Sequence, residues 1–310
     1  MFVYNPSRIN VGSIAWLDES APVIVSPMYV VFEVDDEMVT PAYLMLFLNS
    51  KLGRSRIESR TEVGARFRLT YASLSRIAVP LPPIPVQRLI VQTLNQFTEL
   101  EAALEAELEA RRAQAQFYRA DLISSAATGA AWRSLGEVAS VRTGQAPRQG
   151  VPAPSGEYSF VNAGTTESGR SPESNTDGDT VTIPSRGQGG VGVVGYQVAP
   201  FWCGPLCYRI RSSTEALHSR FLYYFLKSIQ PSIRALQQAA GTPALNRKEL
   251  ILVEVPLPPI EIQERVVGVL DQFDALVNDI SIGLPAELAA RRKQYEYYRD
   301  KLLTFEEAAA

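Results

Sequence analysis

The 310-residue sequence has only two cysteines and one histidine, and it has no long apolar run. Two cysteines, Cys203 and Cys207, are too few for a secreted domain stapled by disulfides, so we expect a reducing compartment. The lone His218 excludes a convincing Ser-His-Asp triad, and its place at a predicted helix start indicates a surface or capping role. Because no ~20-residue apolar stretch and no basic, apolar leader occur, the sequence favours a cytosolic protein without a membrane span.

Motifs for catalysis are also missing. The glycine-rich segment GQGGVG at 187–192 lacks the Lys-Ser/Thr of a phosphate-binding loop, and it predicts a tight hairpin whose backbone faces a partner. Cys203, Cys207 and His218 could supply three zinc ligands, but the cysteines lie in an alternating apolar stretch, FWCGPLCYRI, typical of a strand interior. We therefore expect no metal, no cofactor and no catalytic residue, and we interpret the chain as a reader or a scaffold.

What the sequence does contain is an internal repeat. VPLPPIPVQR at 79–88 returns as VPLPPIEIQER at 255–265, and the pattern ARRxQxxxYRxxL at 110–122 returns at 290–302. The residues before each proline motif also match, at an offset of about 178, so the duplicated unit is a globular domain followed by its helix. Residues 132–178 have no counterpart near the N-terminus, so we expect the first domain to be incomplete.

Each repeat ends in a predicted long helix. The Pro-Pro pair excludes helix up to about residue 84, and apolar residues then recur at steps of three, four or seven, as in a coiled-coil seam. SIGLPAEL at 281–288 should interrupt the second helix, whereas the first should run unbroken for about 60 Å. We expect an α+β protein in four parts: a partial first domain (1–79), a central helix (80–130), a second domain (131–255) and a distal helix (256–310).

Charge is distributed unevenly along the chain, whose net charge is −3. Residues 131–257 carry 12 basic and 9 acidic side chains, while both helical segments are acidic, so nucleic acid is expected on the domains. Loops such as RTGQAPRQG are rich in side chains that hydrogen-bond bases and phosphates, although an ordinary surface loop is the alternative that composition alone favours. The candidate DNA contacts are Arg142, Gln145, Arg148, Asn162, Arg170, Ser185, Arg186, Gln188, Asn246, Arg247 and Lys248 in the second domain, and Arg8, Arg66 and Arg68 in the first.

This organisation resembles the specificity subunit of a type I restriction-modification system. The resemblance is carried by VPLPPIEIQERVV, GLPAELAARRKQYEYYRDKLLTF and the duplicated P-S-R and F-L segments, and it extends from Met1 to Phe305. It implies two target-recognition domains that each read half of a bipartite site in double-stranded DNA, and long helices that pair as an antiparallel coiled coil. It also implies partners: methyltransferase (modification) subunits and a restriction-translocase subunit would use S-adenosylmethionine, ATP and Mg²⁺, while this subunit is non-catalytic.

The helices are expected to pair along one seam and to leave their acidic faces and arginine pairs for partner subunits. The residues assigned to helix pairing and partner binding are Leu94, Phe97, Leu104, Leu108, Arg111, Arg112, Leu270, Phe273, Val277, Arg291, Arg292, Tyr295 and Leu302. The alternative function is a truncated or silent specificity cassette that acts only as a helical assembly scaffold, or as a half-site reader that dimerises. An open strand edge within residues 1–78 would favour self-association, unless those residues form a smaller closed domain.

Overall fold

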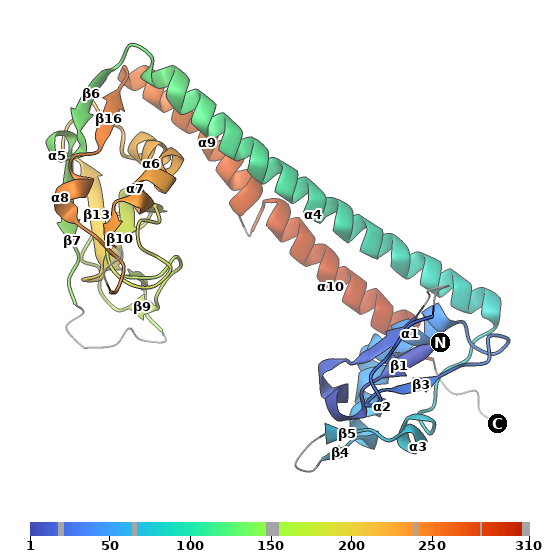
Figure 1. Ribbon diagram of the computed structural model, residues 1–310. Coiled ribbons are helices and arrows are strands. Elements are labelled where there is room, and N and C mark those ends of the chain that lie inside the picture. The colour runs from blue at the N-terminus through green and yellow to red at the C-terminus, as the bar shows by residue number, and fades with distance from the viewer. Residues whose placement is uncertain (18–21, 64–66, 147–154, 239–240, 280, 306–310) are drawn as a thin grey trace. The chain divides into compact units, whose positions relative to one another are not determined.

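A computed structural model describes residues 1–310 except 18–21, 64–66, 147–154, 239–240, 280 and 306–310 (Figure 1). The chain forms two compact units. The first unit comprises Met1–Leu108 with Ile280–Ala310, and the second unit comprises Glu109–Asp279. Each unit thus combines a globular domain with a segment of the long helices, and the mixture of helices and sheets confirms the expected α+β class. None of the helices in the described residues has an apolar stretch long enough to cross a bilayer.

The globular part of the first unit is a small antiparallel sheet with helices. Its sheet has the strand order β2-β1-β3, and β4 pairs with β5 in a hairpin. The elements are β1 (Phe2–Tyr4), the 3₁₀ helix η1 (Pro6–Val11), β2 (Ile14–Trp16), β3 (Val30–Phe32), α1 (Pro41–Asn49), α2 (Lys51–Arg60), β4 (Glu62–Val63), β5 (Phe67–Arg68) and α3 (Tyr71–Leu74).

The globular part of the second unit is larger. It contains a sheet of order β11-β10-β13-β7, a sheet of order β12-β8-β9, and the pairs β16-β6 and β14-β15. The elements are β6 (Ala131–Ser134), α5 (Leu135–Val138), β7 (Ala139–Thr143), β8 (Tyr158–Val161), β9 (Arg170–Ser171), β10 (Thr180–Pro184), β11 (Gly195–Gln197), β12 (Phe201–Cys203), β13 (Cys207–Ser212), α6 (Ser219–Ser228), α7 (Gln230–Ala235), β14 (Gln237–Gln238), β15 (Ala244–Leu245), α8 (Arg247–Leu250) and β16 (Glu254–Leu257).

Strand register shows how the two sheets correspond. Phe2 of β1 pairs with Trp16 of β2, just as Val181 of β10 pairs with Tyr196 of β11. The third strand, β3 or β13, lies on the other side in each sheet. However, β13 has β7 as a further neighbour, whereas β3 has none among the described residues, and its Val31 is 42% exposed. β7, which lies within the residues 132–178 that have no counterpart near the N-terminus, thus supplies a strand without an equivalent in the described part of the first sheet.

The first long helix begins where the sequence predicts, and the second is interrupted where the sequence predicts. α4 (Ile84–Ala127) is continuous and contributes to both units. The second repeat is divided into α9 (Ile260–Asn278) and α10 (Leu284–Leu302), with Gly283 capping α10 and Pro285 in its first turn. Proline is tolerated there because the first turn has no intrahelical partner for its amide nitrogen. The predicted break between the two halves is confirmed.

Aromatic stacking shows that the helices run antiparallel. In the first unit the ring of Phe97 stacks on Tyr298, with centroids 5.6 Å apart, and in the second unit Tyr118 stacks on Phe273 at 5.4 Å. In the first unit Glu101, which follows Phe97 along α4, pairs with Arg292, which precedes Tyr298 along α10, and only an antiparallel arrangement allows this order. The repeat relates Phe97 to Phe273 and Tyr118 to Tyr298, so the same contact is made twice.

The predicted helix seam is partly buried. Leu94, Leu108, Leu270 and Val277 are buried, in line with their apolar spacing. The other apolar seam positions keep partial exposure, and these are Phe97, Leu104, Phe273, Tyr295 and Leu302. Arg111 and Arg291 each donate to the glutamine three residues later on the same helix.

One arginine and two carboxylates that were expected to face partner subunits pair with each other. In the first unit Arg292 of α10 donates to Glu101 of α4 at 2.6 Å, and it also bonds Glu105. Antiparallel pairing sets the acidic stretch of α4 beside the basic end of the repeat, so these side chains bond each other at the surface, and their contact with partner subunits stays a prediction. Since Arg292 is half exposed, solvent screens these pairs and they stabilise the helices by little. Arg112 pairs with Glu109 on its own helix.

A buried glutamine fixes each helix to its own domain. In the second unit Gln263 donates from Nε2 to the carbonyl oxygens of Pro258 and Ala216, both at 2.8 Å, and its Oε1 accepts from the amide of His218 at 2.9 Å. His218 also caps α6, because its Nδ1 accepts from the amide of Arg220. The predicted capping role of this histidine is confirmed.

The first unit repeats this arrangement. Gln87 donates from Nε2 to the carbonyl oxygens of Pro82 at 2.8 Å and Met38 at 3.0 Å, and its Oε1 accepts from the amide of Thr40 at 2.9 Å. Both glutamines are fully buried. The glutamine of the proline motif therefore joins the start of a long helix to the start of the domain helix, which is α1 in one unit and α6 in the other.

Candidate nucleic-acid interface

Backbone hydrogen bonds bring together the arginine-bearing segments of the second unit. The amide of Leu245 donates to the carbonyl of Ser185 at 2.8 Å, and the amide of Gly187 donates to Pro243 at 3.2 Å. The segment after β10 therefore lies against β15. Arg247 Nε donates to the carbonyl of Val141 at 2.8 Å, which brings the start of α8 to β7. Seven predicted DNA contacts lie on these adjoining segments: Arg142, Ser185, Arg186, Gln188, Asn246, Arg247 and Lys248.

Four of these residues form an exposed basic cluster, which we define as Arg142, Arg186, Arg247 and Lys248. The positive charge of this cluster affects the pKa of Tyr208, whose hydroxyl donates to the carbonyl of Leu245. Burial raises the pKa of Tyr208, and the nearby positive charges of Arg247 and Arg186 oppose that rise. The two arginines thus act on one point although they lie 61 positions apart in the chain. An exposed cluster of this kind attracts phosphate groups.

Two of the three remaining members of the group, Ser185 and Asn246, have structural roles. Ser185 is buried and takes part through its backbone. Asn246 caps α8, with its Oδ1 accepting from the amide of Lys248 at 3.1 Å. Gln188 is exposed in the turn between β10 and β11, beside Gly187 and Gly189, which both have positive φ angles. The segment is a hairpin loop as predicted, but it is longer than a tight turn, because it joins β10 at Pro184 to β11 at Gly195.

The other predicted contacts lie in a second group of loops around β12. Asn162 accepts at Oδ1 from the amide of Leu206, and the amide of Gln145 donates to the carbonyl of Cys203, both at 2.9 Å. Arg170 donates to the carbonyls of Gly156 and Glu157 and pairs with Glu167, so its guanidinium is engaged within its own loop. Arg148 and, in the first unit, Arg66 lie outside the described residues.

Sequence reasoning missed the residues that hold these loops in place. Asn175 donates to the carbonyl of Cys203 at 3.0 Å and accepts from its amide at 2.8 Å, in the manner of a paired strand. Arg209 of β13 donates to the carbonyl of Asn175 and to the hydroxyl of Thr176. In the strand register it pairs with Arg142 of the neighbouring strand β7. The alternation in CYRIRS could have placed Arg209 on the outer face, but nothing local identified its partners.

The two cysteines are buried in neighbouring strands, Cys203 at the end of β12 and Cys207 at the start of β13. The stretch expected to be one strand interior is therefore two strands in separate sheets, joined by a turn. Hydrogen bonding to Cys203 and burial raise the pKa of the Cys207 thiol, which keeps it neutral. In the part of the chain that the structure describes, no group of three His, Cys, Asp or Glu side chains could hold a metal ion.

A polar hollow of about 370 Å³ lies between the loop after β8 and the β10-β11 pair. Gly190 lies against this loop so closely that a Cβ there would be 2.1 Å from the carbonyl oxygen of Ala163. The hollow is therefore shaped by backbone packing. Its lining includes the hydroxyl, amide and carboxylate side chains of Ser159, Thr165, Thr166, Glu167, Thr182 and Gln197.

The first unit contains a counterpart of the second unit's adjoining segments. The amide of Leu69 donates to the carbonyl of Pro6 at 3.1 Å, as Leu245 does to Ser185. This bond holds η1, which carries the exposed Arg8, against β5, which carries the exposed Arg68. Two predicted contacts of the first domain are thus brought side by side by the same backbone interaction.

Comparisons with known proteins agree with this organisation. The family model described as "Type I restriction modification DNA specificity domain" matches residues 2–110 and 130–290. The chain is 28% identical to the EcoR124I/EcoR124II specificity subunit of Escherichia coli, over 94% of this chain and 77% of that protein. It is 32% identical to the MpnII specificity subunit of Mycoplasma pneumoniae, over 48% of this chain and 45% of that one.

A solved structure shows the same fold. The S subunit of a type I restriction-modification system from M. genitalium matches with a TM-score of 0.63 at 20% identity, covering 88% of this chain and 75% of that one. The family model covers both globular domains and most of the helical residues, so the match is not confined to one repeat. The chain therefore belongs to the family of type I restriction-modification DNA specificity proteins.

Proposed function

We propose that the chain is the DNA-reading specificity subunit of a type I restriction-modification complex, with the second unit reading one half of a bipartite site. The observation that supports this most is the basic cluster, in which three separate chain segments present exposed cations beside the hydrogen-bonding loops. Arg142, Arg186 and Lys248 are suited to phosphate and base-edge contacts. Asn162 and Arg170 hold loops in position. Because the Leu69 amide donates to the Pro6 carbonyl and so joins the segments that carry Arg8 and Arg68, the first unit has the same kind of surface.

The long helices are the proposed docking site for the methyltransferase subunits. Exposed polar side chains cover their outer faces, and Arg112 and Lys293 are exposed there. In this assignment methyl transfer and DNA cleavage belong to partner subunits, which would also use S-adenosylmethionine, ATP and Mg²⁺. The chain itself contributes sequence recognition and assembly.

The proposal is tested with the assembled methyltransferase complex and a DNA duplex that carries its site. Arg186→Gln should relax methylation at one base position and cost about 1–3 kcal/mol of binding if the side chain reads a base. Lys248→Gln should weaken binding evenly across sequences and lower the salt dependence by about one charge. Lys51→Gln, an exposed change at the start of α2, is the matched control for charge, because it lies outside both the long helices and the predicted DNA contacts. Unchanged methylation with both domain variants would refute the contact assignment.

The alternative is a half-site reader that self-associates through the edge of β3. The specific observation in its favour is that β3 has no second neighbour among the described residues, and exposed edges invite pairing with another chain. Deleting residues 1–78 and measuring mass and methylation pattern separates the two functions. Loss of self-association with an unchanged half-site favours the alternative, and loss of half of the recognised sequence favours the bipartite reader.

A further inference from the structure

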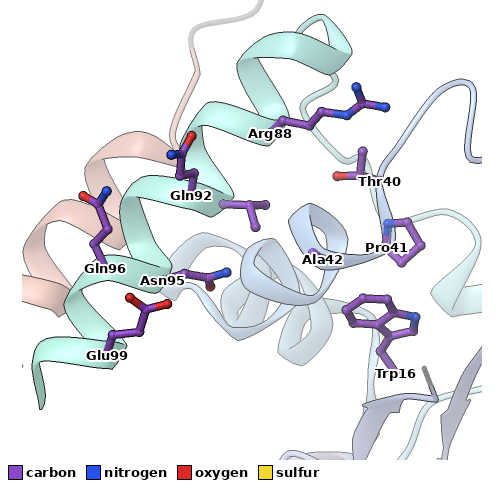
Figure 2. Close-up of a pocket in the computed structure, with 10 residues that line it drawn as sticks. Trp16, Thr40, Pro41, Ala42, Arg88, Gln92, Asn95, Gln96 and Glu99 are labelled. Carbon is purple, nitrogen blue, oxygen red and sulfur yellow. The ribbon is translucent and has the colours of Figure 1, made fainter. Parts of the chain in front are cut away.

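A groove of about 580 Å³ opens in the first unit between the start of α1 and one face of α4 (Figure 2). Trp16 and Ala42 lie on one side, and four polar residues of α4 lie on the other. These four recur at steps of three or four, so they project from one face of the helix. They are Gln92, Asn95, Gln96 and Glu99, all exposed.

This groove has a counterpart in the second unit, and the repeat fixes how the two correspond. The buried glutamines bond Thr40 in one unit and His218 in the other, so Ala42 corresponds to Arg220. The two copies of the proline motif, which begin at Val79 and Val255, match Asn95 of α4 with Asp271 of α9. Phe32 and Ile210 correspond at the repeat's offset of 178 and pair with Phe2 and Val181. Because Phe2 and Val181 pair in turn with Trp16 and Tyr196, strand register matches Trp16 with Tyr196. Tyr196, Arg220 and Asp271 line a groove of the second unit.

In the second unit an arginine of the same chain lies in this place. The guanidinium of Arg220 lies 4.5 Å from the ring centroid of Tyr196, and 5.0 and 5.1 Å from those of Tyr223 and Tyr224. Its Nε donates to Asp271 at 2.7 Å. A cation over an aromatic ring is attracted by the negative face of the ring, and the attraction grows as water is excluded. The domain helix α6 is thereby fixed to α9.

The first unit has one aromatic ring, Trp16, and polar groups of α4 at this place, while Met45 and Leu46 stand where the second unit has Tyr223 and Tyr224. Ala42 stands at the position of Arg220, and among the described residues no lysine or arginine lies over the ring of Trp16. Tryptophan is the best of the aromatic rings for binding a cation. Thr40 Oγ1, which is buried at the groove wall, has no hydrogen-bond partner.

The polar groups near Trp16 suit a positive charge. Asn95 stands where the second unit has Asp271, and Glu99 supplies a carboxylate one turn further along α4. The groove also contains Arg88, which Figure 2 shows near Thr40, at the opposite end from Glu99. Eleven residues separate Arg88 from Glu99, or about 16 Å along the helix. The charge of Arg88 is therefore remote from the end of the groove that carries Glu99.

We propose that this groove binds an arginine side chain supplied by a protein partner, in the place that Arg220 occupies in the second unit. The guanidinium lies over Trp16, and its NH groups donate to Asn95 Oδ1 and the Glu99 carboxylate. Arginine is favoured over lysine because a planar guanidinium can stack on a ring and donate sideways at once. The inference rests on the proposed function for the identity of the partner, which is a methyltransferase subunit.

The first test needs only the purified chain and N-acetylarginine amide as the probe. The chain has three tryptophans, so three indole NH signals are expected in an NMR spectrum, and Trp16→Phe identifies one of them. Titration should shift the Trp16 signal and leave those of Trp132 and Trp202 in place. N-acetyllysine amide is the matched control and should shift it several-fold less. No shift of the Trp16 signal, or an equal shift with the lysine probe, overturns the proposal.

The second test supplies the arginine within the chain. Ala42→Arg should compete for the groove, abolish the shift with N-acetylarginine amide, and weaken assembly with the methyltransferase subunits at least tenfold. Ala72→Arg, an exposed change on α3, controls for added charge. If the wild-type chain fails to assemble, the proposed function fails, and the probe titration still decides the groove. If Ala42→Arg assembles as well as the wild-type chain does, the groove is not the docking site.

Discussion

Gln87 and Gln263 make equivalent side-chain hydrogen bonds in the two units, each donating to two carbonyls and accepting from one amide. Both side chains are fully buried, so every one of these bonds replaces contact with water. The glutamine therefore makes the same contacts in both copies of the repeated motif, and in each copy it connects the long helix to its domain.

We expect Gln263→Glu to lower the free energy of unfolding of the second unit by about 2–4 kcal/mol near pH 7, because a carboxylate oxygen would face two carbonyls without a donor. This site raises the pKa of the introduced carboxyl group above its unfolded value. The penalty is then small at low pH, where the protonated group can donate, and it grows as pH rises. Urea denaturation at pH 5 and pH 7.5 measures it.

Gln272→Glu is the control for that change, since it introduces the same charge at an exposed position of the same helix. It should alter stability by less than about 0.5 kcal/mol. Equal effects of the two substitutions would show that the buried bonds contribute nothing specific.

The stacked rings provide a second prediction. Phe273→Ala and Phe97→Ala should each cost about 1–3 kcal/mol, less than the 3–5 kcal/mol of a fully buried ring, because both side chains keep partial exposure. The two losses should be similar, since the Phe-Tyr contact is repeated. Thermal melting measures them against Phe117→Ala, whose ring is 66% exposed and which should change stability little. If Phe117→Ala lowered stability as much as the other two substitutions, the helix seam would have been assigned to the wrong face.

Tyr43→Phe tests the buried phenol of the first unit. The Tyr43 hydroxyl donates to the carbonyl of Pro80 at 3.0 Å, so its loss should cost about 1 kcal/mol at pH 8. Phenylalanine fits this position, because Phe221 occupies the equivalent one. Burial raises the pKa of Tyr43 from 10.0 to about 12.

The sign of the pH effect follows from that shift. The folded state favours the neutral phenol, so its stabilisation is complete below pH 10 and is lost as pH rises towards 12. The wild-type chain therefore loses stability over this range, whereas the Tyr43→Phe variant is spared that part of the loss. The difference between them should shrink and reverse by about pH 11, as judged by urea denaturation, while exposed Tyr29→Phe shows no such crossing.

Gly190→Ala should disturb the loops beside the basic cluster without affecting the helices. The added Cβ would meet the carbonyl oxygen of Ala163, which cannot yield without moving its loop, and overpacking of this kind costs about 1–3 kcal/mol. DNA retention by the assembled complex should fall, while the helical circular dichroism stays unchanged. Gly189→Asn is the matched control, because Gly189 has φ +88° and open space around it. Equal DNA retention by both variants would show that the loop is not part of the DNA interface.

The sequence alone determined the features that depend on neighbouring residues. The Pro-Pro pair and the apolar spacing predicted where α4 begins and that it is continuous, and Gly283 and Pro285 predicted the break before α10. His218 was recognised as a cap from its place at a helix start. These predictions succeeded because proline geometry, capping and helical periodicity act over a few residues.

Only the tertiary structure decided which side chains meet. It engaged Arg170 within its own loop, paired Arg292 with Glu101, and set Arg247 against the strand that carries Arg142. It also placed Trp16 beside a groove in which Ala42 takes the position that Arg220 holds in the second unit. None of these outcomes has a local pattern, because each depends on segments that are distant in the chain and are brought together by sheet register and antiparallel helix pairing.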